Sequence, residues 1–307
     1  MRARIASKGA PGAQFLDPTV LTRIGNLELL ASSVVEGFIA GLHSSPFLGL
    51  SLDFAAHREY MPGDDIRNID WKVWGRTDRF YIKEYEAETN ANVFFALDSS
   101  RSMSYGSRGI TKLEYAKYLT ACLAYLSASQ RDRVGAAVFG ARLQDYVRPS
   151  VRNRRLVLAT LDRAEATEAG DLVKPLTQIA ESLVRKGIVV LVSDLYADPR
   201  EVIKSLGALR TKGHDVIVFH ILDPAEVDFP FEAPRSFEDL ETGERLPVTP
   251  DDMREEYMAL LEGHVGELTH TLTDHGIDHE MIVTSTPLDV ALFQYLSYRA
   301  RRLKGRS

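Results

Sequence analysis

The chain has 307 residues, 45% of them hydrophobic and 26% charged, a composition typical of globular proteins with roughly two domains. The net charge of −6 excludes general attraction to nucleic acid or to anionic membranes. The single cysteine, Cys122, excludes an internal disulfide and fits a reducing compartment. No apolar stretch approaches the ~20 residues of a transmembrane helix, and the N-terminus lacks the apolar centre of a signal peptide. We therefore expect a cytoplasmic protein with no transmembrane segment and no nucleic-acid partner.

The first 90 residues differ from the rest of the chain in composition and in hydrophobic pattern. Residues 1–17 are rich in Gly, Ala and Pro, which predicts a flexible N-terminus. Apolar residues then recur with helical spacing from Pro18 to about Leu42. Short strand-like pieces follow in a region rich in Gly, Pro and Asp, including RFYIKEYEAET with its strand period. We expect residues 18–90 to form a small N-terminal module that packs against the remainder.

From Asn92 onward, short apolar runs alternate with helix-like segments. The runs NVFFALD, VGAAVFG, IVVLVSD and DVIVFHIL lack polar alternation, which is typical of strands buried on both faces. Residues 91–303 are therefore predicted to form an α/β domain, with a doubly wound, mostly parallel sheet and helices on both faces. A Thr-Gly pair between extended segments in Phe237–Val248 predicts a β-hairpin insertion at about 227–249.

Two predicted strands end in an acid, Asp98 and Asp194, at the edge where doubly wound sheets bind ligands. Asp98 opens a D-x-S-x-S sequence, so its carboxylate and the hydroxyls of Ser100 and Ser102 can converge on one point. Oxygen ligands of this kind suit a hard divalent cation, Mg²⁺ or alternatively Mn²⁺ or Ca²⁺. The pattern alone also fits a helix N-cap loop. The buried strand before it and the second strand-end acid favour the cation site.

The segments FALDSSRSM and VLVSDL resemble the von Willebrand factor A fold and its metal ion-dependent adhesion site. The resemblance implies that Asp98, Ser100 and Ser102 form one metal-binding loop. It also implies that Asp194 is the acid from the fourth strand, and that a partner protein's Asp or Glu fills the metal's last position.

The resemblance also implies a threonine from a second loop, but this sequence has no threonine at the expected position. The segment EATEAGDLVKPL has Gly170 before Asp171, where relatives usually show threonine, and Thr167 lies three residues away. Either Asp171 or Thr167 substitutes as a metal ligand, or the site is weakened. The alternative for Asp171, which we favour, is an N-cap for the following helix.

Upstream, the sequence closely resembles the bacterial family known as domain of unknown function 58 (DUF58). The hallmark R-x-Y-x-x-G-D-D-x-R-x-I-D-W is matched by Arg58, Tyr60, Gly63, Asp64, Asp65, Arg67, Ile69, Asp70 and Trp71. The resemblance runs from about Gly41 to Arg299. It implies a von Willebrand A-type domain. Many members are encoded beside MoxR-type AAA+ ATPases, so it also implies a partner of that class.

The hallmark segment itself has two possible roles. Its arginines and aspartates can form bidentate ion pairs, and Trp71 can bury against the α/β domain, so that the motif holds a domain junction. The same residues could instead form a recognition surface with arginine and tryptophan hot spots. We favour the structural role.

Other chemistries find little support. His275 and His279 are four apart but lie across a turn, which disfavours a zinc site. No phosphate-binding loop or dinucleotide glycine pattern is present, and no serine-hydrolase elbow. An aspartyl phosphotransfer site at Asp98 needs a second acid and a lysine, and no lysine is expected at that sheet edge.

The sequence thus predicts a non-enzymatic, Mg²⁺-dependent protein-interaction module, an adaptor or partner of a MoxR-type ATPase in the assembly or maturation of a complex. One alternative is a Mg²⁺-dependent phosphotransfer or hydrolase enzyme that uses Asp98. Another is a scaffold in which the metal site is degenerate because the threonine is missing.

Overall fold

The computed structural model describes residues 18–22, 24–44, 56–59, 81–84, 91–166, 169–240 and 243–304. The segment 1–17, predicted to be flexible, lies outside these residues. The chain begins with the short helix α1 (Pro18–Leu21) and the long helix α2 (Leu27–Ser44). Strands β1 (Ala56–Glu59) and β2 (Tyr81–Glu84) pair antiparallel, with Ala56 opposite Glu84.

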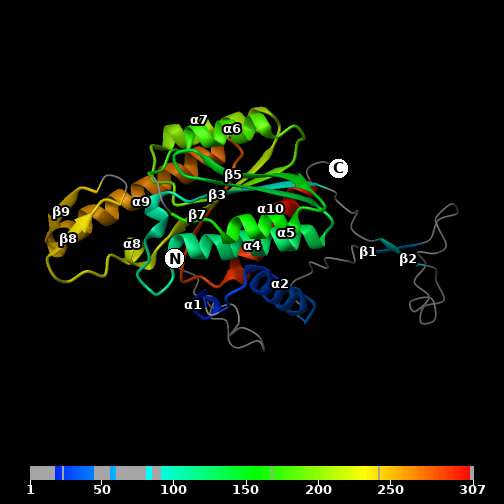
Figure 1. Ribbon diagram of the computed structural model, residues 1–307, viewed down its shortest axis with the longest axis horizontal. Coiled ribbons are helices and arrows are strands. Elements are labelled where there is room, and N and C mark those ends of the chain that lie inside the picture. Colours follow the sequence, from blue (N-terminus) through cyan, green and yellow to red (C-terminus); the bar gives the residue numbers. More distant parts are fainter. Residues whose placement is uncertain are drawn as a thin grey trace.

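A six-stranded sheet lies at the centre of the α/β domain (Figure 1). Its strands are β3 (Asn92–Asp98), β4 (Arg133–Phe139), β5 (Leu143–Ser150), β6 (Ile188–Ser193), β7 (Asp215–Leu222) and β10 (Asp278–Val283). Their order is β10-β7-β6-β3-β4-β5, and every pair is parallel except β4 with β5. The predicted doubly wound, mostly parallel sheet is therefore confirmed, with an antiparallel strand at one edge.

Helices cover both faces of this sheet (Figure 1). One face carries α4 (Lys112–Ser129), α5 (Arg154–Asp162), α10 (Leu288–Lys304) and α2; the other carries α6 (Val173–Ser182), α7 (Pro199–Thr211) and α9 (Pro250–Asp274). Alternate strand residues serve the two cores, since Phe95 and Leu97 join the first cluster and Phe94 and Ala96 the second. Because both faces of the sheet are covered by helices, side chains on either face are buried, which explains the unbroken apolar runs in the sequence.

Helix α2 belongs to the core of the α/β domain. Leu30, Val34 and Val35 are at most 1% exposed and lie in the same hydrophobic cluster as Leu119 and Leu123 of α4. Helix α2, which the sequence assigned to the N-terminal module at 18–90, therefore packs on the helical layer of the α/β domain. None of the described helices is long and apolar enough to cross a membrane.

The predicted hairpin insertion is also confirmed. After β7, the short helix α8 (Pro224–Asp228) leads to β8 (Arg235–Glu238) and β9 (Arg245–Val248), which pair antiparallel. Phe229, Phe231 and Phe237 pack their rings together, and Phe229 also contacts Tyr257 of α9. This aromatic cluster ties the hairpin to the helix that follows it.

The register of the sheet brings the two strand-end acids to one edge. Strands β3 and β6 are parallel neighbours, with Leu97 opposite Val192. Asp98 and Asp194 follow these positions at the carboxyl ends of adjacent strands. The helix α4 begins at the same edge, where Thr111 and Glu114 form a capping box.

Candidate functional site

The loop after β3 gathers the three residues predicted for it. Ser99 anchors the loop to β4, because its main-chain nitrogen and its hydroxyl both donate to the carbonyl of Phe139. Oδ1 of Asp98 accepts a hydrogen bond of 2.8 Å from the nitrogen of Ser100, and the hydroxyls of Ser100 and Ser102 are 3.1 Å apart. Asp98, Ser100 and Ser102 are each less than 10% exposed. The loop thus turns one carboxylate and two hydroxyls into a single buried polar cluster.

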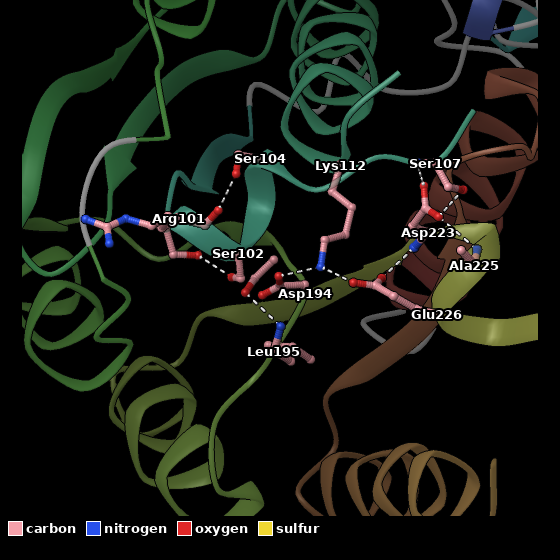
Figure 2. Close-up of polar contacts among 12 residues, drawn as sticks. Arg101, Ser102, Ser104, Ser107, Lys112, Asp194, Leu195, Asp223, Ala225 and Glu226 are labelled. Carbon is pink, nitrogen blue, oxygen red and sulfur yellow. Dashed lines mark hydrogen bonds and ion pairs between the residues drawn. The ribbon is translucent and has the colours of Figure 1, made fainter. Parts of the chain in front are cut away.

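The second acid, Asp194, lies in a buried ion-pair network (Figure 2). Nζ of Lys112 is 2.8 Å from Oδ2 of Asp194 and 2.8 Å from Oε1 of Glu226 on α8. The Lys112 side chain is fully buried and lies over the ring of Tyr196. A buried ammonium with two carboxylate partners satisfies most of its donors. Lys112 therefore joins the start of α4 to the end of β6 and to the hairpin insertion.

The segment between the Asp98 loop and α4 is held to α8 as well. Asp223 accepts hydrogen bonds from the nitrogen and the hydroxyl of Ser107, as Figure 2 shows. Asp223 also caps α8 by a capping box with Glu226. The hairpin insertion is thus anchored on the candidate site.

Two carboxylates oppose each other electrostatically at this edge. Burial raises the pKa of Asp98 to about 7, and the charge of Asp194 adds to the rise. Ser193 and Ser100 donate hydrogen bonds to Asp98, and the Ser193 hydroxyl is 2.5 Å from its Oδ2. These hydrogen bonds lower the pKa of Asp98, but they offset the rise only in part. Burial alone would lower the pKa of Lys112, but Asp194 and Glu226 raise it above its usual value. Lys112 is thus held charged, whereas Asp98 has no cationic partner among the described residues.

The position of the missing threonine faces Ser100. A Cβ built on Gly170 would lie 3.0 Å from the Cβ of Ser100, so the second loop does reach the site without presenting a side chain there. Asp171 accepts hydrogen bonds from the nitrogens of Val173 and Lys174, at the start of α6. Asp171 thus binds the first nitrogens of α6, as a capping residue does, but from one position before Leu172, which occupies the N-cap itself. Thr167 lies outside the described residues.

Comparison with protein families finds a match at residues 56–266, to the family described as "Protein of unknown function DUF58". The chain belongs to this family. An uncharacterized protein of Mycobacterium tuberculosis is 25% identical over 267 residues, which cover 85% of this chain and 83% of the relative. The matched segment is shorter than the predicted Gly41–Arg299 and includes both the hallmark motif and the Asp98 loop.

Two solved structures resemble this DUF58 protein. BatB of Bacteroides thetaiotaomicron matches with a TM-score of 0.47 and 17% identity. The matched region spans 69% of this chain and 99% of the BatB chain. The SpRpn10 VWA domain, of the von Willebrand A type, has a TM-score of 0.40 and 12% identity, and covers 66% of this chain and 93% of its own. The α/β fold class itself rests on the strand order and the two helical layers described above.

The residues present in this DUF58 protein fit a hard, oxygen-preferring cation. Within the described part of the chain, no group of three or more His, Cys, Asp or Glu that could hold a metal is found, so a cation at this edge would need hydroxyl oxygens among its ligands. Asp98, Ser100 and Ser102 provide such a mixed set. Asp98, Asp194 and Glu226 together exceed the single charge of Lys112 by two when all are ionised. A divalent cation that keeps several waters matches both the oxygen ligands and this charge.

Lys112 corrects the expectation that this sheet edge has no lysine. The sequence carried one usable signal for it: Thr111 and Glu114 form the T-x-x-E of a capping box, which makes Lys112 the first residue of a helix that follows a strand-end loop. Its partners were beyond sequence reasoning, because Asp194 and Glu226 lie 82 and 114 positions away.

The hallmark motif is described only at its first residue. Arg58 lies in β1, with its Cα opposite that of Ile82 in β2. The remaining motif residues lie outside the described residues: Tyr60, Gly63, Asp64, Asp65, Arg67, Ile69, Asp70 and Trp71. The choice between a structural role and a recognition surface for this motif stays a prediction.

Proposed function

We propose that this DUF58 protein is a protein-interaction module that docks its partner through a divalent cation at the carboxyl edge of the sheet. Asp98, Ser100 and Ser102 would hold Mg²⁺, or Mn²⁺ or Ca²⁺ in its place. A partner's Asp or Glu completes the coordination. The observation that supports this most directly is the buried cluster of one carboxylate and two hydroxyls, in which no described residue supplies a positive charge to Asp98.

Asp194 has a different role in this proposal from the one that the resemblance implies. Its Oδ2 is occupied by Lys112, so Asp194 contributes mainly negative charge to the cation's surroundings. The cation relieves the repulsion between Asp98 and Asp194, because it places a positive charge beside the carboxylate that has none. Lys112 and Glu226 keep Asp194 at the edge whether or not the cation is bound.

The partner class comes from the family resemblance. MoxR-type AAA+ ATPases are the class it implies, and the chain would act as their adaptor in the assembly or maturation of a complex. The chemistry of the site adds one requirement, which is that the partner presents an Asp or Glu on the docking surface.

Affinity capture from a lysate of the source cell tests this proposal. The baits are the wild type, Asp98→Ala and Asp171→Asn, each with Mg²⁺ or with EDTA, and circular dichroism verifies that each bait is folded. Asp171→Asn is the matched control, because this carboxylate lies near the site and is used by α6. We expect a MoxR-type ATPase to be retained in Mg²⁺ by the wild type and by Asp171→Asn, and not by Asp98→Ala. Identical partners in every lane would overturn the proposal.

Lys112 favours a second candidate function, aspartyl phosphotransfer. With Asp98 as nucleophile, Asp194 as second acid and Lys112 as cation, the edge holds the three groups that such chemistry uses. Against it, both known partners of Lys112 are carboxylates of the chain, so its ammonium group is already engaged. Hydrolysis of p-nitrophenyl phosphate that depends on Mg²⁺ and is lost in Asp98→Asn would establish this function instead.

Thermal unfolding distinguishes the scaffold alternative, in which the metal site is degenerate, from the interaction module and from the phosphotransfer enzyme. A cation that binds the native state raises its melting temperature by linkage. No shift with Mg²⁺, Mn²⁺ or Ca²⁺ would leave a scaffold as the remaining function.

A further inference from the structure

A cavity of about 350 Å³ opens at the amino edge of the sheet, at the opposite ends of the strands from the Asp98 loop. It lies where β3 and β4 begin, where the antiparallel β5 ends, and where the chain passes from α6 to β6. Its lining consists of Asn92, Arg133, Tyr146, Arg148, Pro149, Ser150, Val151, Ser182, Leu183, Val184 and Arg185. The volume is at the lower end of the range of ligand-binding pockets, about 300–1,000 Å³.

The lining carries charge of one sign. Three of its residues are arginines, Arg133, Arg148 and Arg185, and none is acidic. Neither Arg148 nor Arg185 forms an ion pair with an acidic side chain among the described residues. In a chain whose net charge is −6, this concentration of guanidinium groups is a local exception that attracts anions.

The walls of the cavity are built before any ligand arrives. The side-chain amide of Asn92 donates to the carbonyl of Lys186, and a Cβ on Gly187 would meet the carbonyl of Asn92 at 2.1 Å. The glycine therefore allows the loop before β6 to touch the start of β3. On the other side, the ring of Tyr146 packs on Phe94. A preformed wall lowers the ordering cost of binding.

Apolar side chains stand beside the arginines at the rim. Val184 is 81% exposed and Val151 is 56% exposed, so both present apolar surface to the solvent beside the arginines. A bare inorganic anion would use the guanidinium groups and leave both valines in water. A peptide can use both, since carboxylates match the planar fork of arginine and its aliphatic side chains can cover the valines. In addition, β5 is the edge strand of the sheet and contributes Tyr146, Arg148, Pro149 and Ser150 to the lining.

From these features we propose that the cavity binds an acidic peptide segment of a partner protein, with its carboxylates on Arg148 and Arg185 and its aliphatic side chains on Val151 and Val184. This site is separate from the candidate cation site, because no residue of the Asp98 loop lines it. Binding here is expected without any metal ion. The module then has one contact surface at each edge of its sheet.

Fluorescence anisotropy with a short fluorescein-labelled peptide of alternating Glu and Val tests this proposal. Arg148→Glu and Arg185→Glu are each expected to weaken binding about tenfold or more, because a charge-assisted hydrogen bond is replaced by repulsion. Arg152→Glu is the matched control, since Arg152 is exposed on the adjoining turn and does not line the cavity. Its affinity is expected to stay within about twofold of the wild type. Arg148→Gln removes the charge without inverting it, and thermal unfolding verifies that all variants fold.

Further arms of the experiment decide between the proposal and its competitors. Equal weakening by Arg152→Glu would show diffuse attraction and overturn the site, as would equal binding of a Gln-Val peptide. Displacement of the peptide by inorganic phosphate at a similar concentration would identify a small-anion site and overturn the peptide. Asp98→Ala and EDTA are expected to leave the affinity unchanged, so failure of the cation site and failure of this cavity give different results.

Discussion

The two edges of the sheet carry opposite charge in opposite settings. At the carboxyl edge, the carboxylates of Asp194 and Glu226 pair with the fully buried ammonium group of Lys112, and the buried carboxylate of Asp98 is close enough to Asp194 to be repelled by it. At the amino edge, three arginines line an open cavity with no acid in its wall. Helix α4 begins at the carboxyl edge, where its positive N-terminus favours acids, and α6 ends beside the cavity, where its negative C-terminus favours arginines.

What distinguishes the two sites is burial. The charged groups at the carboxyl edge lie largely in the interior and depend on each other. Arg148 and Arg185 at the cavity are exposed to water and available to a ligand, although the same edge also holds the buried ion pair of Asp132 with Arg299. Substitutions at the two edges should therefore differ greatly in their effect on stability.

The largest effect is expected for Lys112→Met. The variant leaves Asp194 and Glu226 buried without their shared cation, so the free energy of unfolding should fall by about 3–5 kcal/mol in urea titrations. Lys174→Met is the control, because Lys174 is 79% exposed and pairs with Asp171 only at the surface. It should cost less than about 1 kcal/mol. A stable Lys112→Met protein would show that burial at the carboxyl edge has no energetic consequence.

The second effect is a loss of stability in acid, through histidines between β7, β10 and α9. Burial lowers the pKa of His220 to about 3 and that of His279 to about 4, and both stay neutral in the native state. A depressed histidine pKa means that stability is complete above the unfolded value near 6.5 and falls as the pH drops below it. Between pH 7 and 5 each histidine should cost on the order of 2 kcal/mol. Asp98 opposes this loss in part, because its raised pKa makes the native state gain stability as the pH falls through about 7.

The variant His220→Phe tests the origin of this acid sensitivity. It should reduce the slope of unfolding free energy against pH, measured in EDTA. The control is His270→Gln, whose side chain is 80% exposed and whose removal should leave the slope as in the wild type. An unchanged slope in His220→Phe would assign the acid sensitivity to other groups.

A smaller effect is expected for Gly170→Thr, which restores a hydroxyl where the resemblance implies one. Its Cβ has to displace Ser100 slightly, so stability without metal should decrease modestly. In return, a further oxygen ligand should tighten Mg²⁺ binding several-fold in isothermal titration calorimetry. Weaker Mg²⁺ binding in this variant would mean that the glycine is needed for the loop to approach Ser100.

The smallest effect on stability is expected for Arg185→Gln at the amino edge. This arginine is exposed and has no acidic partner among the described residues, so the melting temperature should match that of the wild type. A large loss of stability would place Arg185 in a structural role, and the contrast between the two edges would disappear.

Much of the fold could be predicted from local patterns. Unbroken apolar runs such as NVFFALD predicted buried strands, and Thr242-Gly243 marked the hairpin whose strands β8 and β9 are observed. For α2, the sequence predicted that it packs against the remainder of the chain, but not that it packs on α4. Amphipathic spacing shows which face of a helix is apolar, but not which other helix will cover it.

The candidate site was predictable only where its residues are close in sequence. Asp98, Ser100 and Ser102 share one loop, and the structure brings them together as expected. Lys112 was missed, since the pairing of a lysine with two distant acids depends on strand order and on where α8 lies. The arginine-lined cavity was also missed, because its residues come from four separate segments with no shared motif.

The central claim is that the carboxyl edge binds a divalent cation through Asp98. The most direct test is isothermal titration of Mg²⁺ into protein stripped with EDTA, for the wild type, Asp98→Asn and the control Asp171→Asn. We predict one Mg²⁺ per chain for the wild type and for Asp171→Asn, and none for Asp98→Asn. Equal binding by Asp98→Asn, or no binding by the wild type, would contradict the account.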